Sequence, residues 1–76
     1  MIEVWVVTLH DGSAVFPVGV YSTKEKAFYY VGKDCANNDR EVKAFFPQLD
    51  GSILCQVTPD CDYEIERFYV NKEMEY

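Results

Sequence analysis

The chain has 76 residues, 49% of them hydrophobic and 16% aromatic, with 13 acidic and 7 basic side chains for a net charge of −6. This length supports one small core, and the hydrophobic content is too high for a disordered chain. We therefore expect a single α+β domain over residues 1–76, with residues 71–76 as a frayed tail. The charge disfavours nucleic acid and anionic membranes as direct partners, and it fits a protein with a basic surface. Solubility alone is the alternative reason for such a charge.

The cellular compartment of the protein is predicted from the lack of a membrane span or signal peptide in this sequence and from the number of its cysteines. No stretch reaches the ~20 apolar residues of a membrane span. Residues 1–9 are too short for a signal peptide and contain Glu3. Three cysteines are an odd number, which disfavours a closed set of disulfides. Together these features predict a cytoplasmic protein.

Two apolar segments, residues 2–9 and 14–21, flank a His-Asp-Gly-Ser turn and predict a β-hairpin. The first segment is apolar at both even and odd positions, which is typical of a central strand covered on both faces. Pro17 has no amide hydrogen to donate, so the second strand should have a free edge or a bulge there.

A helix should follow this hairpin. Ser22-Thr23-Lys24-Glu25 has the spacing of a capping box, with Ser22 accepting a hydrogen bond from the Glu25 amide. The helical period continues past Gly32 to Asn37-Asn38. Tyr29 should point away from the sheet, between two lysines. The side chains expected to face the sheet are Ala27, Phe28, Tyr30, Val31 and Cys35.

The second half of the chain repeats the hairpin pattern. Residues 41–49 and 52–57 flank Asp50-Gly51, and residues 58–62 predict a loop. Residues 63–71 form a last strand, whose apolar positions change parity near Glu66-Arg67 as a bulge would cause. The element order is β-β-α-β-β-β, an antiparallel sheet of four to five strands with one helix on one face. Its second face then needs loops, the tail or a partner to cover its aromatic side chains.

Residue types common in catalytic sites occur here, although not in catalytic arrangements. His10, Asp11 and Ser13 share one turn, from which they cannot align on opposite sides of an imidazole ring. No pair of cysteines has the short spacing of a zinc knuckle. We therefore expect no catalytic residue, no metal and no cofactor.

Each cysteine has a predicted environment. Cys35 on the inner helix face and Cys55 within a strand are expected in the core. Cys61 falls in the predicted loop and is expected to react with thiol reagents, and a Cys55–Cys61 disulfide is the alternative.

The last strand is the best candidate for a binding site. Glu64 and Glu66 share a face near two aspartates and could dock on basic side chains or mimic phosphates. The alternative is a solvated edge strand whose charges only prevent pairing between sheets. The residues expected to contact a partner are Asp60, Asp62, Glu64, Glu66, Tyr63, Tyr69 and Tyr29.

Two segments carry a resemblance to known proteins. Val18-Gly19-Val20-Tyr21-Ser22-Thr23-Lys24-Glu25-Lys26-Ala27 and the strand Tyr63–Val70 resemble the strand-to-helix junction and closing strand of small, uncharacterised bacterial and phage ββα-type proteins. The resemblance covers about a third of the chain and implies the fold described above.

Small acidic phage proteins of this size include inhibitors of host nucleases and defence complexes. By analogy, this resemblance implies a phage- or mobile-element-encoded, non-enzymatic inhibitor or interaction module that binds a basic protein surface. A structural or accessory domain that forms a homodimer through an aromatic sheet face is the alternative. An enzyme or small-ligand binder is the third.

Overall fold

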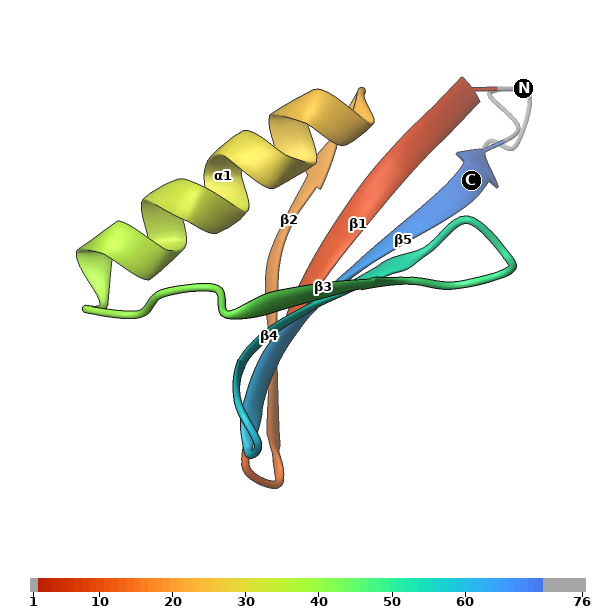
Figure 1. The fold of residues 1–76 in the computed structure, drawn as a ribbon. Helices are drawn as coiled ribbons and strands as arrows, with labels where there is room; N and C mark the ends of the chain where they lie inside the picture. Colours follow the sequence, from red (N-terminus) through yellow and green to blue (C-terminus); the bar gives the residue numbers. More distant parts are fainter. Residues whose placement is uncertain (1, 71–76) are drawn as a thin grey trace.

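The computed structural model describes residues 2–70, in which one helix packs on one face of a five-stranded antiparallel sheet (Figure 1). The strand order across the sheet is β2-β1-β5-β4-β3. The α+β class and the predicted element order are confirmed, and the predicted frayed tail lies outside the described residues. The elements are β1 (Ile2–Asp11), β2 (Ala14–Tyr21), α1 (Lys24–Asn37), β3 (Ala44–Pro47), β4 (Ile53–Thr58) and β5 (Cys61–Val70).

The first hairpin has the features that its glycine and proline predict. Its two-residue turn begins at Gly12, whose φ of 62° suits the first loop position of a type II′ turn. β2 is an edge strand, and its register with β1 shifts just before Thr8, which pairs with Pro17 and leaves Val18 as the extra residue of a bulge. Pro17 therefore has both the free edge and the bulge expected of it.

The helix begins one residue later than the capping-box pattern predicts. Thr23 has an extended backbone, and its hydroxyl accepts a hydrogen bond from the Lys26 amide at 3.1 Å. Ser22 as the cap is therefore wrong, because the Ser and Thr that are adjacent here are both good caps and the sequence does not choose between them. The predicted continuation past Gly32 to Asn37 is confirmed.

The core lies between α1 and the sheet. The helix contributes Ala27, Val31 and Cys35, as predicted, and Phe28 packs at the margin. Tyr30 faces the edge of the sheet, where its ring stacks on Tyr21 of β2 with centroids 4.8 Å apart, but it is 43% exposed and does not join the core. The buried apolar side chains of the sheet are all odd-numbered, namely Trp5, Val7, Leu9, Cys55, Val57, Cys61, Tyr63 and Ile65, and the partly buried Val18 packs against them beyond the bulge of β2.

β5 is the middle strand of the sheet, with β1 on one side and β4 on the other. Its pairing with β1 runs from Cys61 to Val70 without a register shift, so the bulge predicted near Glu66-Arg67 is wrong. The parity change has another cause, because Phe68 and Val70 lie on the face away from the helix. The interpretation of this strand as a sheet edge is also wrong, since β2 and β3 are the edges.

Other boundaries and faces differ from expectation. The third strand covers only Ala44–Pro47. The predicted loop at 58–62 is a tight turn, because β5 already begins at Cys61. β1 is internal as predicted, but Val4 and Val6 are only half-buried, so the expected cover on its second face is wrong.

The position of the cap gives a stability test. Thr23→Ala should lower the free energy of unfolding by about 1 kcal/mol, because the Lys26 amide loses its acceptor. Ser22→Ala should change it by less than ~0.5 kcal/mol. Urea denaturation of both variants measures the difference, and a larger loss for Ser22→Ala would contradict this assignment.

Candidate functional site

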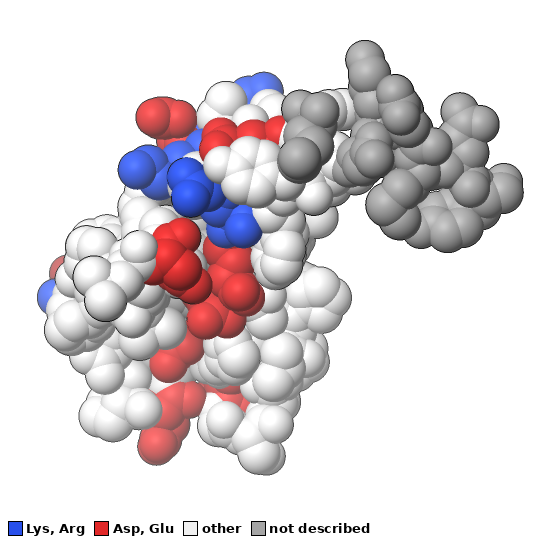
Figure 2. Space-filling view, turned by 90° about the vertical axis from the view of Figure 1, so that its right-hand side faces the viewer, with Lys and Arg blue, Asp and Glu red and all other residues white. Residues whose placement is uncertain are grey.

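Three carboxylates form a column on the face of the sheet opposite α1. Asp62, Glu64 and Glu66 alternate along β5, so they point to the same side, ~6.7 Å apart along the strand. Because β5 is central, the column crosses the middle of this face, where Figure 2 shows acidic side chains with uncharged surface on both sides. We call these three side chains the acidic column.

We call the whole side of the sheet opposite α1 the open face. Side chains of β1 and β4 flank the column directly, as the strand pairing shows, and they are Val6, Thr8, His10, Leu54 and Gln56. Val4 continues the same face opposite Phe68. Exposed apolar side chains lie around them: Ile2, Val20, Phe46, Phe68 and Val70 are each 45–62% exposed. The open face therefore combines a charged centre with apolar margins.

The negative charge of the column is poorly compensated within residues 2–70. Its only ion-pair contact is between His10 Nε2 and Glu64 Oε1, 3.6 Å apart. The lysine and arginine ion pairs of the described chain involve other carboxylates. A hydrogen bond with Glu64 raises the pKa of Glu66, and partial burial and the Glu64 charge raise it further. The column therefore holds more negative charge than its surroundings stabilise.

Tyr63 does not belong to the binding surface, and its prediction as a contact residue is wrong. Its side chain is fully buried on the helix side, because strand alternation turns it away from Glu64. Its hydroxyl donates to the Asp34 carboxylate and accepts from Arg40 Nη1 at 3.4 Å. Burial and the Asp34 hydrogen bond both raise the pKa of Tyr63, so this residue is structural.

The other predicted contact residues lie in different places. Asp60 is exposed in the β4–β5 turn, where its carbonyl accepts the Gly12 amide at 2.7 Å. Tyr69 is on the helix side of β5, with the Arg67 guanidinium 5.5 Å from its ring. Tyr29 is exposed on the outer surface of α1 under Lys33. The structure therefore brings together Asp62, Glu64 and Glu66, and not the rest.

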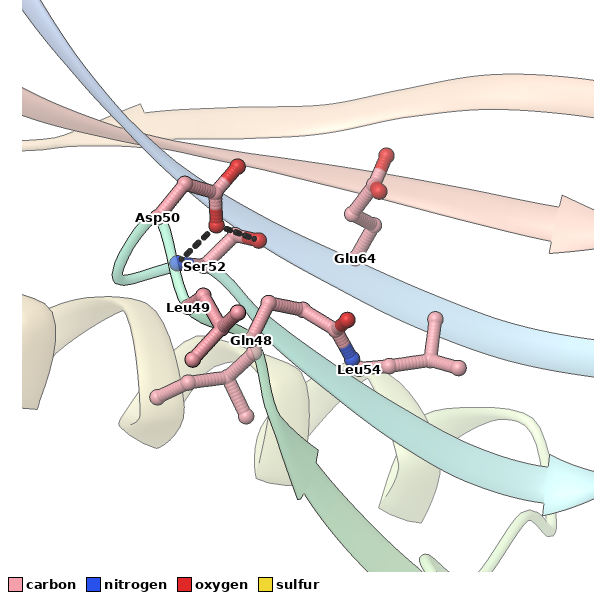
Figure 3. Close-up of a pocket in the computed structure, with 7 residues that line it drawn as sticks. Gln48, Leu49, Asp50, Ser52, Leu54 and Glu64 are labelled. Atoms are coloured by element: carbon pink, nitrogen blue, oxygen red, sulfur yellow. Dashed lines mark hydrogen bonds between the residues drawn. The ribbon is translucent and has the colours of Figure 1, made fainter.

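A hollow beside the column was not identified from the sequence. It has a volume of about 530 Å³ and is formed by the β3–β4 hairpin against Glu64 (Figure 3). We call it the hairpin hollow, and its lining is Gln48, Leu49, Asp50, Ser52, Ile53, Leu54 and Glu64. The Asp-Gly turn was visible in the sequence, but the pairing of β4 with β5 that brings Glu64 to it is a long-range contact.

Asp50 is held in place at the rim of this hollow. One oxygen of its carboxylate accepts hydrogen bonds from the Ser52 hydroxyl at 2.6 Å and the Ser52 amide at 2.9 Å. These two bonds lower the pKa of Asp50. Gly51, with a φ of 92°, makes the turn that allows this geometry. Asp50 is therefore a fixed negative charge.

No catalytic relay forms at the first turn. His10 lies on the open face, whereas Asp11 is an odd-numbered neighbour that pairs with Arg40 at 3.7 Å. The two side chains therefore point to opposite sides of β1. In the part of the chain that the structure describes, no group of three His, Cys, Asp or Glu side chains could hold a metal ion.

All three cysteines are free and buried. The expectation that Cys61 is exposed in a loop is wrong, because β5 begins at this residue and turns its side chain into the core. The alternative Cys55–Cys61 disulfide is also not formed. Burial raises the pKa of Cys55 to about 11 and also raises that of Cys35.

Comparison with protein-family models, curated proteins and solved structures finds no match for this chain. The resemblance of its strand-to-helix junction to small bacterial and phage proteins therefore stays a prediction. Over residues 2–70, α1 is neither long nor apolar enough to cross a membrane.

The burial of the thiols predicts slow modification. In the native protein at pH 8, a thiol reagent such as 5,5′-dithiobis(2-nitrobenzoate) should react with the cysteines at least ~100-fold more slowly than in denaturant, because reagent must wait for local opening. Absorbance at 412 nm follows the reaction. One thiol that reacts immediately would restore the loop interpretation of Cys61.

The carboxylate pair predicts a pH dependence. The folded-state pKa of Glu66 is raised above 4.5, so its contribution to stability is present at low pH and is lost as pH rises through the raised value. Glu66→Gln removes the charge repulsion, so its stability relative to wild type should increase from pH 4 to pH 7. Urea denaturation across this range measures the effect.

Glu41→Gln is the control for this titration, because Glu41 is an exposed carboxylate outside the sheet. The control should follow wild type at every pH. If Glu66→Gln also follows wild type, the two glutamates do not interact as described.

Proposed function

We propose that this chain is a non-enzymatic module that binds the basic surface of a partner protein on its open face. The observation that supports this proposal is the acidic column in the middle of a sheet face that no helix or strand of residues 2–70 covers. Charges that protect a sheet from aggregation belong on edge strands, and β5 has a neighbour on each side. The column therefore needs another reason, and a cationic partner supplies one.

Both components of the open face contribute to binding such a partner. The carboxylates attract basic groups over a distance and speed the encounter. The apolar margins, such as Phe46 and Phe68, supply area that is removed from water on contact. A basic partner would also remove the repulsion between Glu64 and Glu66, which the raised pKa of Glu66 reports.

An inhibitor is the form of this function that the resemblance to phage proteins favours. Carboxylates repeated along a strand present negative charge in a line, as a nucleic acid backbone does. A nuclease or defence complex whose groove binds phosphates would meet the same sign of charge on this face. In this proposal the chain acts in the cytoplasm and competes for that groove without chemistry of its own.

Self-association through the open face is the second candidate, and the exposed apolar margins favour it. The column opposes it at neutral pH. Two copies that meet face to face bring two acidic columns together, and like charges in contact destabilise an interface. A basic partner is therefore the better fit.

Two double variants of equal charge test the proposal. Binding of a fluorescent ten-residue oligolysine peptide is measured by anisotropy at low and at physiological salt. Glu64→Gln with Glu66→Gln should weaken binding about ten-fold, because both changes fall on the open face. Glu25→Gln with Glu41→Gln removes the same net charge elsewhere and should weaken it no more than about two-fold.

The comparison separates a site from a general charge effect. If both double variants lose affinity equally, the peptide responds only to net charge and the open face is not a binding surface. If neither loses affinity, the peptide binds elsewhere and the proposal fails.

A further inference from the structure

The hairpin hollow lies next to the acidic column but differs from it in shape and lining. Figure 3 shows Asp50 and Ser52 at the β3–β4 turn and Glu64 on β5 across from them, with Gln48 and Leu54 below them in the view. We propose that the hairpin hollow receives one arginine or lysine side chain of the basic partner and is the anchor point of the open face. This inference rests on the proposed function and names the group that its site recognises.

The polar groups that line the hollow offer more hydrogen-bond acceptors than donors. The Gln48 amide nitrogen donates to the Phe46 carbonyl at 2.9 Å, so its oxygen remains to accept. The Ser52 hydroxyl donates to one oxygen of Asp50, which leaves the other oxygen without a bond from this serine. Glu64 adds acceptor capacity beyond its contacts with His10 and Glu66. A lining with more acceptors than donors suits a guanidinium or ammonium group, which only donates.

The walls of the hollow are aliphatic. Leu49 is fully exposed at the rim, and Leu54 is half-buried on the same face of β4 as the side chain of Glu64 is on β5. Ile53 alternates with Leu54 and packs against the core. Arginine and lysine carry long aliphatic stems, which pack on such walls while the charged end reaches the acceptors. The volume of about 530 Å³ is more than one such side chain requires.

The cation that would fill this hollow is not supplied by its own lining. None of the seven lining residues is basic. Arg67 is the nearest arginine to the turn, where it contributes to the lowered pKa of Asp50. Its guanidinium is placed over the rings of Trp5 and Tyr69, at 6.0 and 5.5 Å, on the helix side of the sheet. The same guanidinium also lies against Gly51, with Nη2 3.4 Å from where a Cβ would stand, so it approaches Asp50 from the helix side. Within residues 2–70 no lysine or arginine pairs with Glu64, which is left to an external donor.

Other occupants fit this lining less well. An anion would meet Asp50 and Glu64 at close range, and like charges repel. A purely apolar side chain would pack on the leucines. It would also displace water from the carboxylates of Asp50 and Glu64 and could not replace the hydrogen bonds that this water makes to them. An arginine or lysine matches the walls and the acceptors together.

The test is a nuclear magnetic resonance titration of the full chain with three small probes. N-acetyl-arginine amide and N-acetyl-lysine amide carry the proposed side chains, and N-acetyl-citrulline amide has the shape of the arginine probe without its charge. The two charged probes should shift the backbone amides of residues 48–54 and of Glu64. The citrulline probe should bind at least about five-fold more weakly.

Two single variants locate the effect. Leu49→Ser alters a fully exposed side chain and Glu64→Gln removes one charge, so both should fold normally. Each should weaken binding of the arginine probe about three- to five-fold. Glu25→Gln on α1 is the matched control and should leave it unchanged.

The inference is overturned if citrulline binds as well as arginine, if the largest shifts lie outside the hollow, or if no shift appears at the highest soluble concentration. Leu49→Ser also allows this inference to be tested separately from the proposed function. Oligolysine binding that depends on Glu64 and Glu66 but ignores Leu49 would leave the open face as the site and remove the hollow as its anchor. If oligolysine binding does not depend on Glu64 and Glu66, the proposed function itself is contradicted.

Discussion

One short helix can cover only one face of this sheet, and the rest of the structure depends on that limit. α1 has 14 residues and is therefore ~21 Å long, while five strands at ~4.8 Å spacing present two broad faces. The helix buries odd-numbered side chains of β1, β4 and β5 and leaves their even-numbered neighbours to the other side. Along β5 the helix buries Cys61, Tyr63 and Ile65, whereas Asp62, Glu64 and Glu66 lie on the other side and are followed there by Phe68 and Val70. The arrangement of charge on the open face is thus a consequence of which face the helix covers.

The buried Tyr63 network fixes this choice of face. The Tyr63 hydroxyl, the Asp34 carboxylate and the Arg40 guanidinium connect the middle strand, the last turns of the helix and the loop that follows. A shift of β5 by one residue would expose Tyr63 and Ile65 and bury Glu64 and Glu66, so the register is strongly specified. The same alternation that makes the core therefore places the carboxylates outward, and no separate feature is required to form the acidic column.

A charged column in the centre of a sheet differs in its energetics from the same charges at an edge. Neighbouring strands on both sides limit its access to water and hold Glu64 and Glu66 close together, which raises the pKa of Glu66. The aliphatic walls and fixed carboxylate of the hairpin hollow lie directly beside it. A basic partner would relieve the repulsion and bury the apolar margins in one event, and this is why binding on the open face accounts for both features.

The sequence by itself determined the local structure: both Asp-Gly turns, the disruption at Pro17, the extent of the helix and the element order, because each depends on residues that are close along the chain. It also identified Glu64 and Glu66 as sharing one face of a strand, whereas Asp62 was expected in the preceding loop and joins them only because β5 begins at Cys61. Only the tertiary structure decided that this strand is the middle of the sheet, that Tyr63 and Cys61 are buried, and that Glu64 lies beside the β3–β4 turn. The order of the strands, and the choice of which face of the sheet the helix covers, depend on contacts between segments far apart in sequence. Alternation within one segment shows which side chains lie together, but it cannot show what covers them.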